Sequence, residues 1–215
     1  MARFKRNQVE EAIFRTLGAQ GERVDELRFR IKRLLVTDRH SGCDAHSEEE
    51  GDRHYAFFSQ GPPGSGTEVK FSGYEAFALL AATMLLEHRL PQGAVVKVMR
   101  QVRARLEPAH AQTLKKDPAT LFDEQAIRSQ AKHGMIAVNN TAPIFLALLT
   151  DSSVGDQRGC GAVEVCRGYE ELGTFFKKHS KPGTGVTLFE FVGLIHSLAG
   201  NLLQVRPVKR GRGAG

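Results

Sequence analysis

The chain has no tryptophan, only three cysteines and no long hydrophobic run. Cys43, Cys160 and Cys166 are an odd number without the spacing of a disulfide framework, so we expect a reducing compartment. The longest apolar run, residues 142–149, is too short to span a bilayer and contains a proline. No apolar segment follows the basic amino terminus, as a secretion signal would require. These absences predict a cytoplasmic protein without membrane association.

The composition is that of a folded globular protein. Of 215 residues, 41% are hydrophobic and 25% are charged, which is enough for a core without disulfides. The residue periodicities described below predict an α+β fold that is mainly helical. We expect three parts: a basic helical unit with a β-hairpin (residues 1–117), an α+β unit for oligomerisation or effector binding (118–207) and a flexible basic tail (208–215).

Two helices are expected near the amino terminus. Asn7 and Glu10 are typical of a helix start, and Gly18 ends the helix that follows. After a short turn, a second helix over residues 24–36 places five apolar side chains within an arc of about 100°. They are Val24, Leu27, Ile31, Leu34 and Leu35. The rest of this helix carries the cations Arg28, Arg30, Lys32 and Arg33.

A hairpin and two more helices are expected next. Residues 55–59 and 67–71 are rich in aromatic and β-branched residues and flank a stretch of glycine and proline, which favours a hairpin. Ser72 and Glu75 then form a capping-box pattern, which predicts a helix that reaches about residue 89. The helix that follows, residues 92–106, has a basic side formed by Lys97, Arg100, Arg103 and Arg105.

The net charge of +6 is unevenly distributed along the chain. Residues 1–35 contain 9 basic and 5 acidic residues, whereas residues 36–70 contain 3 basic and 7 acidic ones. Residues 71–117 are basic again, with 7 basic and 4 acidic residues. Clustered Lys and Arg can neutralise phosphates, so this pattern favours a nucleic acid as the partner. We expect the contacts to come from the basic sides of the two helices, Arg28, Arg30, Lys32, Arg33, Lys97, Arg100, Arg103 and Arg105.

The order of helix, short turn, basic helix and hairpin over residues 7–71 resembles that of winged helix-turn-helix DNA-binding domains. The resemblance implies that the second helix enters the major groove of duplex DNA and that the hairpin contacts the backbone. We interpret the chain as a small regulator of the bacterial type and expect a homo-oligomer, most simply a dimer. One departure is the acidic stretch of residues 38–52, because a wing usually follows the helix more closely.

Two motifs suggest other chemistry but lack its defining residues. Residues 40–54 contain His, Cys, Asp and Glu, yet their spacing matches none of the common zinc patterns, so we expect no metal. The glycine-rich residues 61–67 invite comparison with a phosphate-binding loop, but the lysine that would reach the nucleotide is missing. We therefore expect no cofactor.

The second half of the chain is expected to combine helices with a small sheet. Pro108 and residues 115–118 mark a boundary, after which Asp117 caps a helix over residues 118–132. Short apolar runs predict strands over residues 135–138, 144–149 and 162–166. One helix then extends to about His179, and a capping-box pattern at Thr187 and Glu190 predicts a last, largely buried helix.

Candidate catalytic residues are few. Cys160 and Cys166 with His179 or His196 would suit a thiol nucleophile and its base, but Cys166 lies in a predicted strand. Asp151 follows an apolar strand, where α/β proteins often place functional carboxylates. We expect no enzyme. The alternative to DNA binding is a non-enzymatic interaction or structural component of a larger assembly, and a small enzyme using the loop near Asp151 comes third.

Overall fold

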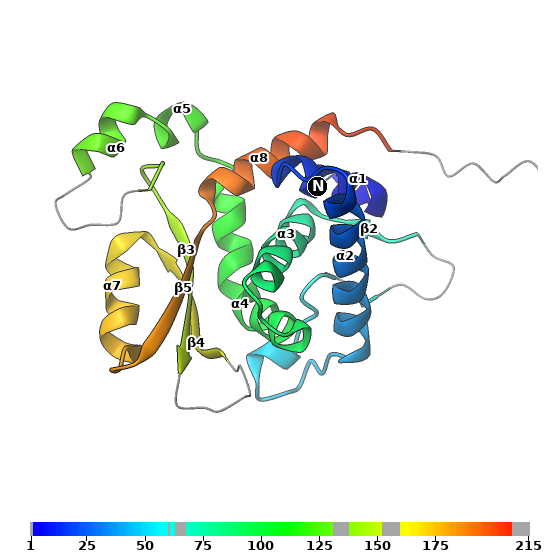
Figure 1. Cartoon of the computed structure of the whole chain (residues 1–215), viewed down its shortest axis with the longest axis horizontal. Helices are drawn as coiled ribbons and strands as arrows, with labels where there is room; N and C mark the ends of the chain where they lie inside the picture. The colour runs from blue at the N-terminus through cyan, green and yellow to red at the C-terminus, as the bar shows by residue number, and fades with distance from the viewer. Residues whose placement is uncertain (1, 60, 63–67, 131–137, 152–159, 208–215) are drawn as a thin grey trace, which may run out of the picture.

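The computed structural model describes residues 2–59, 61–62, 68–130, 138–151 and 160–207. The fold is the mainly helical α+β fold expected from the sequence, with a small carboxy-terminal sheet (Figure 1). In chain order the elements are β1 (Phe4–Lys5), α1 (Arg6–Thr16), α2 (Glu22–His40), the 3-10 helix η1 (Glu50–Asp52), β2 (Lys70–Phe71), α3 (Gly73–Glu87), α4 (Gln92–Thr113), α5 (Pro118–Leu121), α6 (Glu124–Gln130), β3 (Ile144–Asp151), β4 (Cys160–Arg167), α7 (Gly168–His179), β5 (Thr184–Glu190) and α8 (Val192–Gln204). Among the helices of the described residues, none is long and apolar enough to cross a membrane.

A three-stranded antiparallel sheet, in the order β4-β3-β5, lies between a layer formed by α7 and a larger layer formed by α1–α4 and α8, with α5 and α6 beyond its end (Figure 1). Successive side chains of β3 face the two layers alternately. Phe145 and Ala147 lie on the face covered by α7, whereas Leu146 and Leu148 belong to the larger core on the other face. Burial on both faces explains why this strand reads as a continuous apolar run in the sequence.

Helix α3 lies in the middle of the larger core and is apolar on all sides. Phe77, Leu79 and Leu80 have no exposed surface, as expected for a helix enclosed by other elements. Helices α1, α2, α4 and α8 all contact it. The capping box predicted from Ser72 and Glu75 is present, since the Ser72 hydroxyl accepts a hydrogen bond from the Glu75 amide (3.1 Å).

The predicted hairpin is wrong. β2 pairs with β1 at the amino terminus, with Phe4 opposite Phe71, and not with residues 55–59. Residues 55–59 form no strand and lie in a loop whose Ala56 and Phe57 have no exposed surface. The aromatic composition of this segment therefore reflects burial rather than strand pairing.

Three further boundaries differ from the sequence prediction. α4 continues through Pro108 to Thr113; Pro108 and Ala104 are both exposed, so water can satisfy the carbonyl that loses its helical partner. The helix expected over residues 118–132 is two helices, α5 and α6, in the described part. Thr187 and Glu190 lie in β5 and not at a helix start, because β5 pairs along its whole length with β3.

The two predicted units share buried residues. One cluster of buried side chains runs from Val9 through Leu106 to Val205 and includes both α4 and the sheet residue Leu146. The predicted strand over residues 135–138 lies almost wholly outside the described residues, as does the basic tail. The division into units at residue 117 stays a prediction.

Candidate nucleic-acid interface

Helices α1 and α2 form a pair joined by a short turn with two glycines. Gly18 and Gly21 have φ angles of +62° and +56°, a conformation that residues with a side chain rarely adopt. Val9 and Ile13 of α1 and Leu27 and Ile31 of α2 are buried in the core beside the turn. The turn and this packing fix the direction of α2 across the protein surface.

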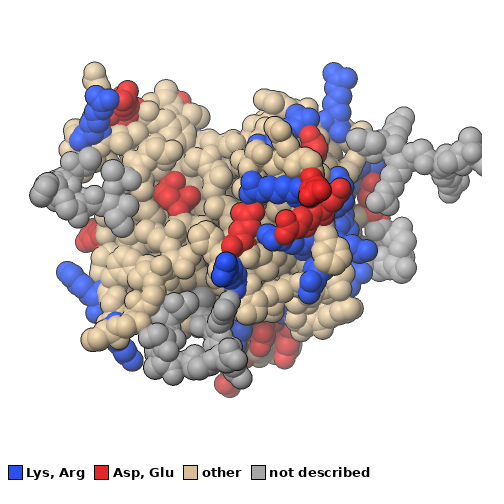
Figure 2. All heavy atoms as spheres, in the orientation of Figure 1, with Lys and Arg blue, Asp and Glu red and all other residues tan. Residues whose placement is uncertain are grey.

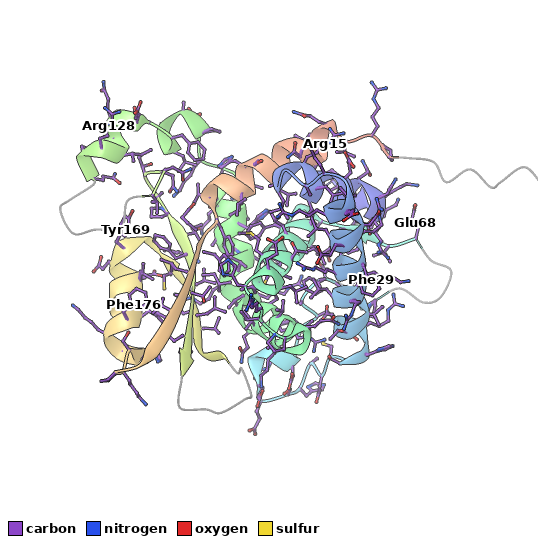
Figure 3. All side chains as sticks on the ribbon, viewed as in Figure 1. Arg15, Phe29, Glu68, Arg128, Tyr169 and Phe176 are labelled. Carbon is purple, nitrogen blue, oxygen red and sulfur yellow. The ribbon has the colours of Figure 1, made fainter. Side chains whose placement is uncertain are left out.

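Helix α2 has an inner face and an outer face. The inner face consists of Leu27, Ile31, Leu34 and Leu35, as predicted, and also of Asp38. The outer face, a name we use for Phe29, Lys32, Arg33 and Val36, follows the spacing of neighbours on one side of a helix. Phe29 is 59% exposed and Val36 is 42% exposed. Figure 3 shows Phe29 on the side of α2 that points away from the rest of the protein.

The four predicted cations of α2 differ in their partners. Arg28 contacts the carboxylates of Asp25 (2.6 Å) and Glu10 (3.7 Å). Arg30 forms an ion pair with Glu26 one turn earlier. Within the described part of the chain, Lys32 and Arg33 form no ion pair, and the Arg33 guanidinium lies over the Phe29 ring at 5.7 Å. The charge of the outer face is therefore not neutralised by any described carboxylate.

Two predicted DNA contacts on α4 are wrong, because Arg100 and Arg103 are buried. Arg100 is 3% exposed and Arg103 is 7% exposed. Arg100 donates from Nε to Oδ1 of Asp38 (2.8 Å) and from Nη2 to the Asp38 backbone carbonyl (2.7 Å). This pair joins α4 to α2 inside the protein. The basic sides of the two helices therefore do not form one continuous surface.

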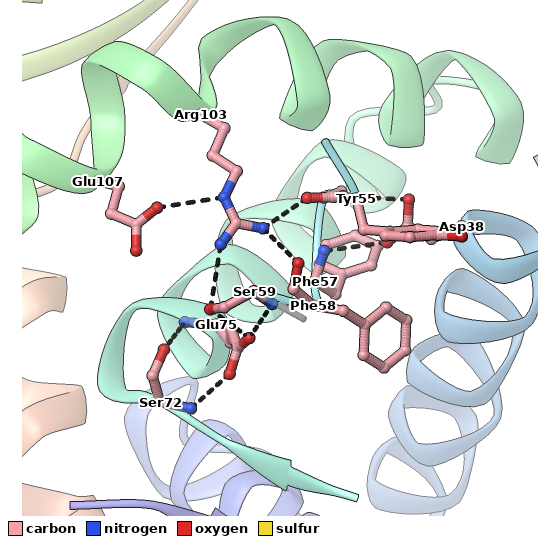
Figure 4. Close-up of polar contacts among 10 residues, drawn as sticks. Asp38, Tyr55, Phe57, Phe58, Ser59, Ser72, Glu75, Arg103 and Glu107 are labelled. Carbon is pink, nitrogen blue, oxygen red and sulfur yellow. Dashed lines mark hydrogen bonds and ion pairs between the residues drawn. The ribbon is translucent and has the colours of Figure 1, made fainter. Parts of the chain in front are cut away.

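Arg103 holds the loop of residues 55–59 in place (Figure 4). Its guanidinium donates to the backbone carbonyls of Tyr55 (2.5 Å) and Phe58 (2.9 Å) and to the Ser59 hydroxyl (3.2 Å). Its Nε donates to Glu107 on the same helix (3.1 Å). These bonds occupy the guanidinium on all sides.

Two buried carboxylates bind the amides of the same loop. Asp38 accepts hydrogen bonds from the backbone amides of Ala56 (3.1 Å) and Phe57 (3.0 Å). Glu75, which also caps α3, accepts a bond from the Ser59 hydroxyl (2.7 Å). Four charged side chains from α2, α3 and α4 thus hydrogen-bond either to this loop, which has no regular secondary structure, or to one another: Asp38, Glu75, Arg100 and Arg103. We call these four side chains the buried charged network.

The remaining predicted cations lie on other parts of the surface. The Lys97 ammonium is 3.7 Å from the Glu49 carboxylate. Glu49 belongs to residues 41–52, which follow α2 and which we call the acidic loop. Arg105 contacts Glu164 on β4 and Glu171 on α7 (3.3 Å), so it joins α4 to the sheet unit. In the view of Figure 2, cationic and acidic side chains are interleaved over α1 and α2 and form no uniform patch. The outer face of α2 is the part of the predicted set that keeps cations without carboxylate partners.

The β1-β2 ribbon lies beside α1, which both strands contact, and β2 also contacts α3. Arg3 donates to the Lys70 carbonyl (3.3 Å), and the Lys5 ammonium is 2.8 Å from Glu68. A two-stranded ribbon next to α1 is thus present, although its strands come from the amino terminus and from the segment before α3.

The other candidate residues have structural positions or lie outside the described part. In the acidic loop, the described side chains form no cluster of three metal-binding groups, and the Cys43 thiol donates to the Arg53 carbonyl. Burial raises the pKa of Cys166 to about 11, and Glu164 adds to the effect, so this thiol is a weak nucleophile at neutral pH. The side chains of Asp151 and Cys160 are not among those described.

The chain matches no protein-family model, no curated protein and no solved structure. Its function is therefore inferred from the geometry and charge of the outer face of α2.

Proposed function

We propose that this protein binds duplex DNA through the outer face of α2. The observation that carries the proposal is that Lys32 and Arg33 have no described acidic partner and lie between two exposed apolar side chains, Phe29 and Val36. Lys and Arg bind phosphates, and apolar side chains in the major groove contact the methyl group of thymine. One helix face thus offers both kinds of contact.

The arrangement around α2 supports the same proposal. A short turn connects α1 to α2 and the β1-β2 ribbon contacts α1, an arrangement similar to that of winged helix-turn-helix domains. The outer face lies in the middle of α2. The first turn of the helix, in contrast, carries the carboxylates of Glu22 and Asp25, which repel phosphates. The central turns of α2 would therefore contact the DNA. The dimer expected from the sequence would present two such helices.

The test is the salt dependence of binding to a labelled DNA duplex, measured by fluorescence anisotropy. The double variant Lys32→Glu/Arg33→Glu should bind more weakly, and the slope of log affinity against log salt should flatten by about 1.8 for two lost phosphate contacts. The matched control is Lys177→Glu/Lys178→Glu, which changes the net charge equally at exposed positions of α7. Equal losses in both variants, or no binding by the wild type at low salt, would contradict the proposal.

A protein partner is the second candidate for the same face. Phe29 and Val36 are more exposed than large apolar side chains usually are, and exposed apolar side chains often mark interaction surfaces. Phe29→Ser/Val36→Ser should then abolish complex formation, whereas Lys32→Glu/Arg33→Glu should weaken it much less. The DNA proposal predicts the opposite order of the two variants in the anisotropy experiment.

A further inference from the structure

A second site lies on the other side of the molecule, between the end of α4 and the start of α7. A cavity of about 310 Å³ is present there, near the lower limit of about 300 Å³ for small-molecule sites. The segment of residues 141–144 forms its third wall. In Figure 1, α7 lies across the sheet from α2, so this cavity is separate from the outer face of α2.

The described lining of the cavity contains cations and no acidic residue. Lys116 comes from the residues after α4, and Arg167 immediately precedes α7. Neither side chain forms an ion pair or a side-chain hydrogen bond with any described residue. Gln112 and Gln130 add amide groups to the lining. Two cations that share a cavity repel each other, so an anion between them would be stabilised.

One of the two carboxylates in the first turn of α7, that of Glu171, already has partners. Glu171 accepts a hydrogen bond from the Arg167 amide (2.8 Å) and contacts the Arg105 guanidinium (3.3 Å). Neither Glu171 nor Glu170, the other acidic residue of this turn, forms an ion pair with the Arg167 side chain. The Gly168 amide, at the first position of α7, donates to the Pro143 carbonyl (2.8 Å) and fixes the start of the helix against the third wall.

We propose that this cavity binds a small anion that carries a phosphate or carboxylate group. Arg167 would form the paired hydrogen bonds that a planar guanidinium offers such groups, and Lys116 would supply a point charge from the opposite wall. The amides of Gln112 and Gln130 would bind polar groups on the remainder of the ligand. The proposal is independent of DNA binding, since none of these residues belongs to the outer face of α2.

The test uses inorganic phosphate and succinate as separate probes, with thermal unfolding followed at constant ionic strength in the absence of DNA. The wild type should show a saturable rise in melting temperature with at least one probe, and the responding probe identifies the group that is bound. Lys116→Gln/Arg167→Gln should weaken that binding about tenfold or more per lost charge. The control Lys177→Gln/Lys178→Gln removes the same charge from exposed positions of α7 and should respond like the wild type.

Two results would overturn the anion site. One is the absence of a saturable response to both probes in the wild type. The other is an equal response in the wild type and in both double variants, because it would indicate a general effect of the ions on stability. Circular dichroism before each titration checks that Lys116→Gln/Arg167→Gln is folded, and Lys116→Gln alone, at an exposed position, provides a milder variant with the same expected direction.

Discussion

Helices α2 and α4 look alike in the sequence and use their cations in opposite ways. Both are long, amphipathic and basic. In α4, Arg100 and Arg103 point inward and bind Asp38 and the loop of residues 55–59. In α2, Lys32 and Arg33 point outward and lie beside the exposed Phe29. A basic helix therefore predicts a nucleic-acid-binding surface only when its cations are known to lie at exposed positions around the helix axis.

The difference between the two helices also concerns energy. A buried ion pair is stable only when hydrogen bonds replace the water that both charges have lost. Arg100 and Asp38 meet this condition, because the carboxylate also accepts two backbone amides and the guanidinium binds a backbone carbonyl. The charged groups of Lys32 and Arg33 are exposed and stay hydrated, so they need no buried partner. Removing Arg100 or Arg103 from α4 should thus be costly, whereas removing Lys32 or Arg33 from α2 should be nearly neutral.

The largest effect is expected for Arg100→Ala. The substitution leaves the Asp38 carboxylate buried without its cation, so the free energy of unfolding should fall by about 3–5 kcal/mol. Urea denaturation followed by circular dichroism measures this loss. Lys97→Ala is the matched control on the same helix, since the Lys97 side chain is 64% exposed, and it should change stability by less than about 0.5 kcal/mol. Similar small losses in both variants would show that the buried charged network does not contribute as described.

The local signals in the sequence were sufficient for several elements. Ser72 and Glu75 predicted the start of α3, and the five apolar residues of α2 predicted its inner face, of which four are buried. Asp117 caps α5, as its position before Pro118 indicated. These features depend on residues within one or two turns, and such local patterns are readable without the tertiary structure.

The buried charged network was missed although the sequence carries a signal for it. At about 100° per residue, Asp38 falls in the middle of the apolar arc of α2, and Arg103 falls between Val96 and Leu106 on α4. Charged residues at core positions are rare unless they are paired. Which charges pair, however, depends on how α2, α3 and α4 pack around the loop of residues 55–59, and one sequence does not determine that. The pairing of β2 with β1 also joins segments that are far apart in the sequence, so local patterns could not predict it.

A second effect, smaller than that of Arg100→Ala, is expected when the pH is lowered. The stability of the protein should then decrease because of His110, a buried residue of α4. His110 is 6% exposed and stacks on the Phe77 ring, with 5.2 Å between centroids. Burial, with a smaller contribution from the charge of His196, lowers the pKa of His110 to about 4. The unfolded chain, with a histidine pKa near 6.5, binds the proton more tightly. Stability from the neutral imidazole is therefore lost as the pH falls from about 6.5 to about 4.

The size of this loss is about 3 kcal/mol if the full shift applies. Chemical denaturation of the wild type and of His110→Phe across this pH window gives the measurement. The variant keeps an aromatic ring against Phe77 and removes the titrating group, so its stability should depend less on pH than that of the wild type. Carboxylates also titrate near pH 4, and only the difference between the two proteins reports on His110. Identical pH profiles would contradict the assignment.

The smallest effect on stability is expected for Lys32→Ala/Arg33→Ala, and it completes the comparison of the two helices. Both side chains are exposed, neither forms an ion pair with a described residue, and alanine favours a helix. The change in the free energy of unfolding should stay within about 0.5 kcal/mol and can be slightly favourable, because the positive charge of α2 decreases. Urea denaturation beside Arg100→Ala measures it under the same conditions. A loss above about 1 kcal/mol would mean that these cations have an intramolecular partner besides the Phe29 ring, and the outer face would then no longer differ from the inner arginines of α4.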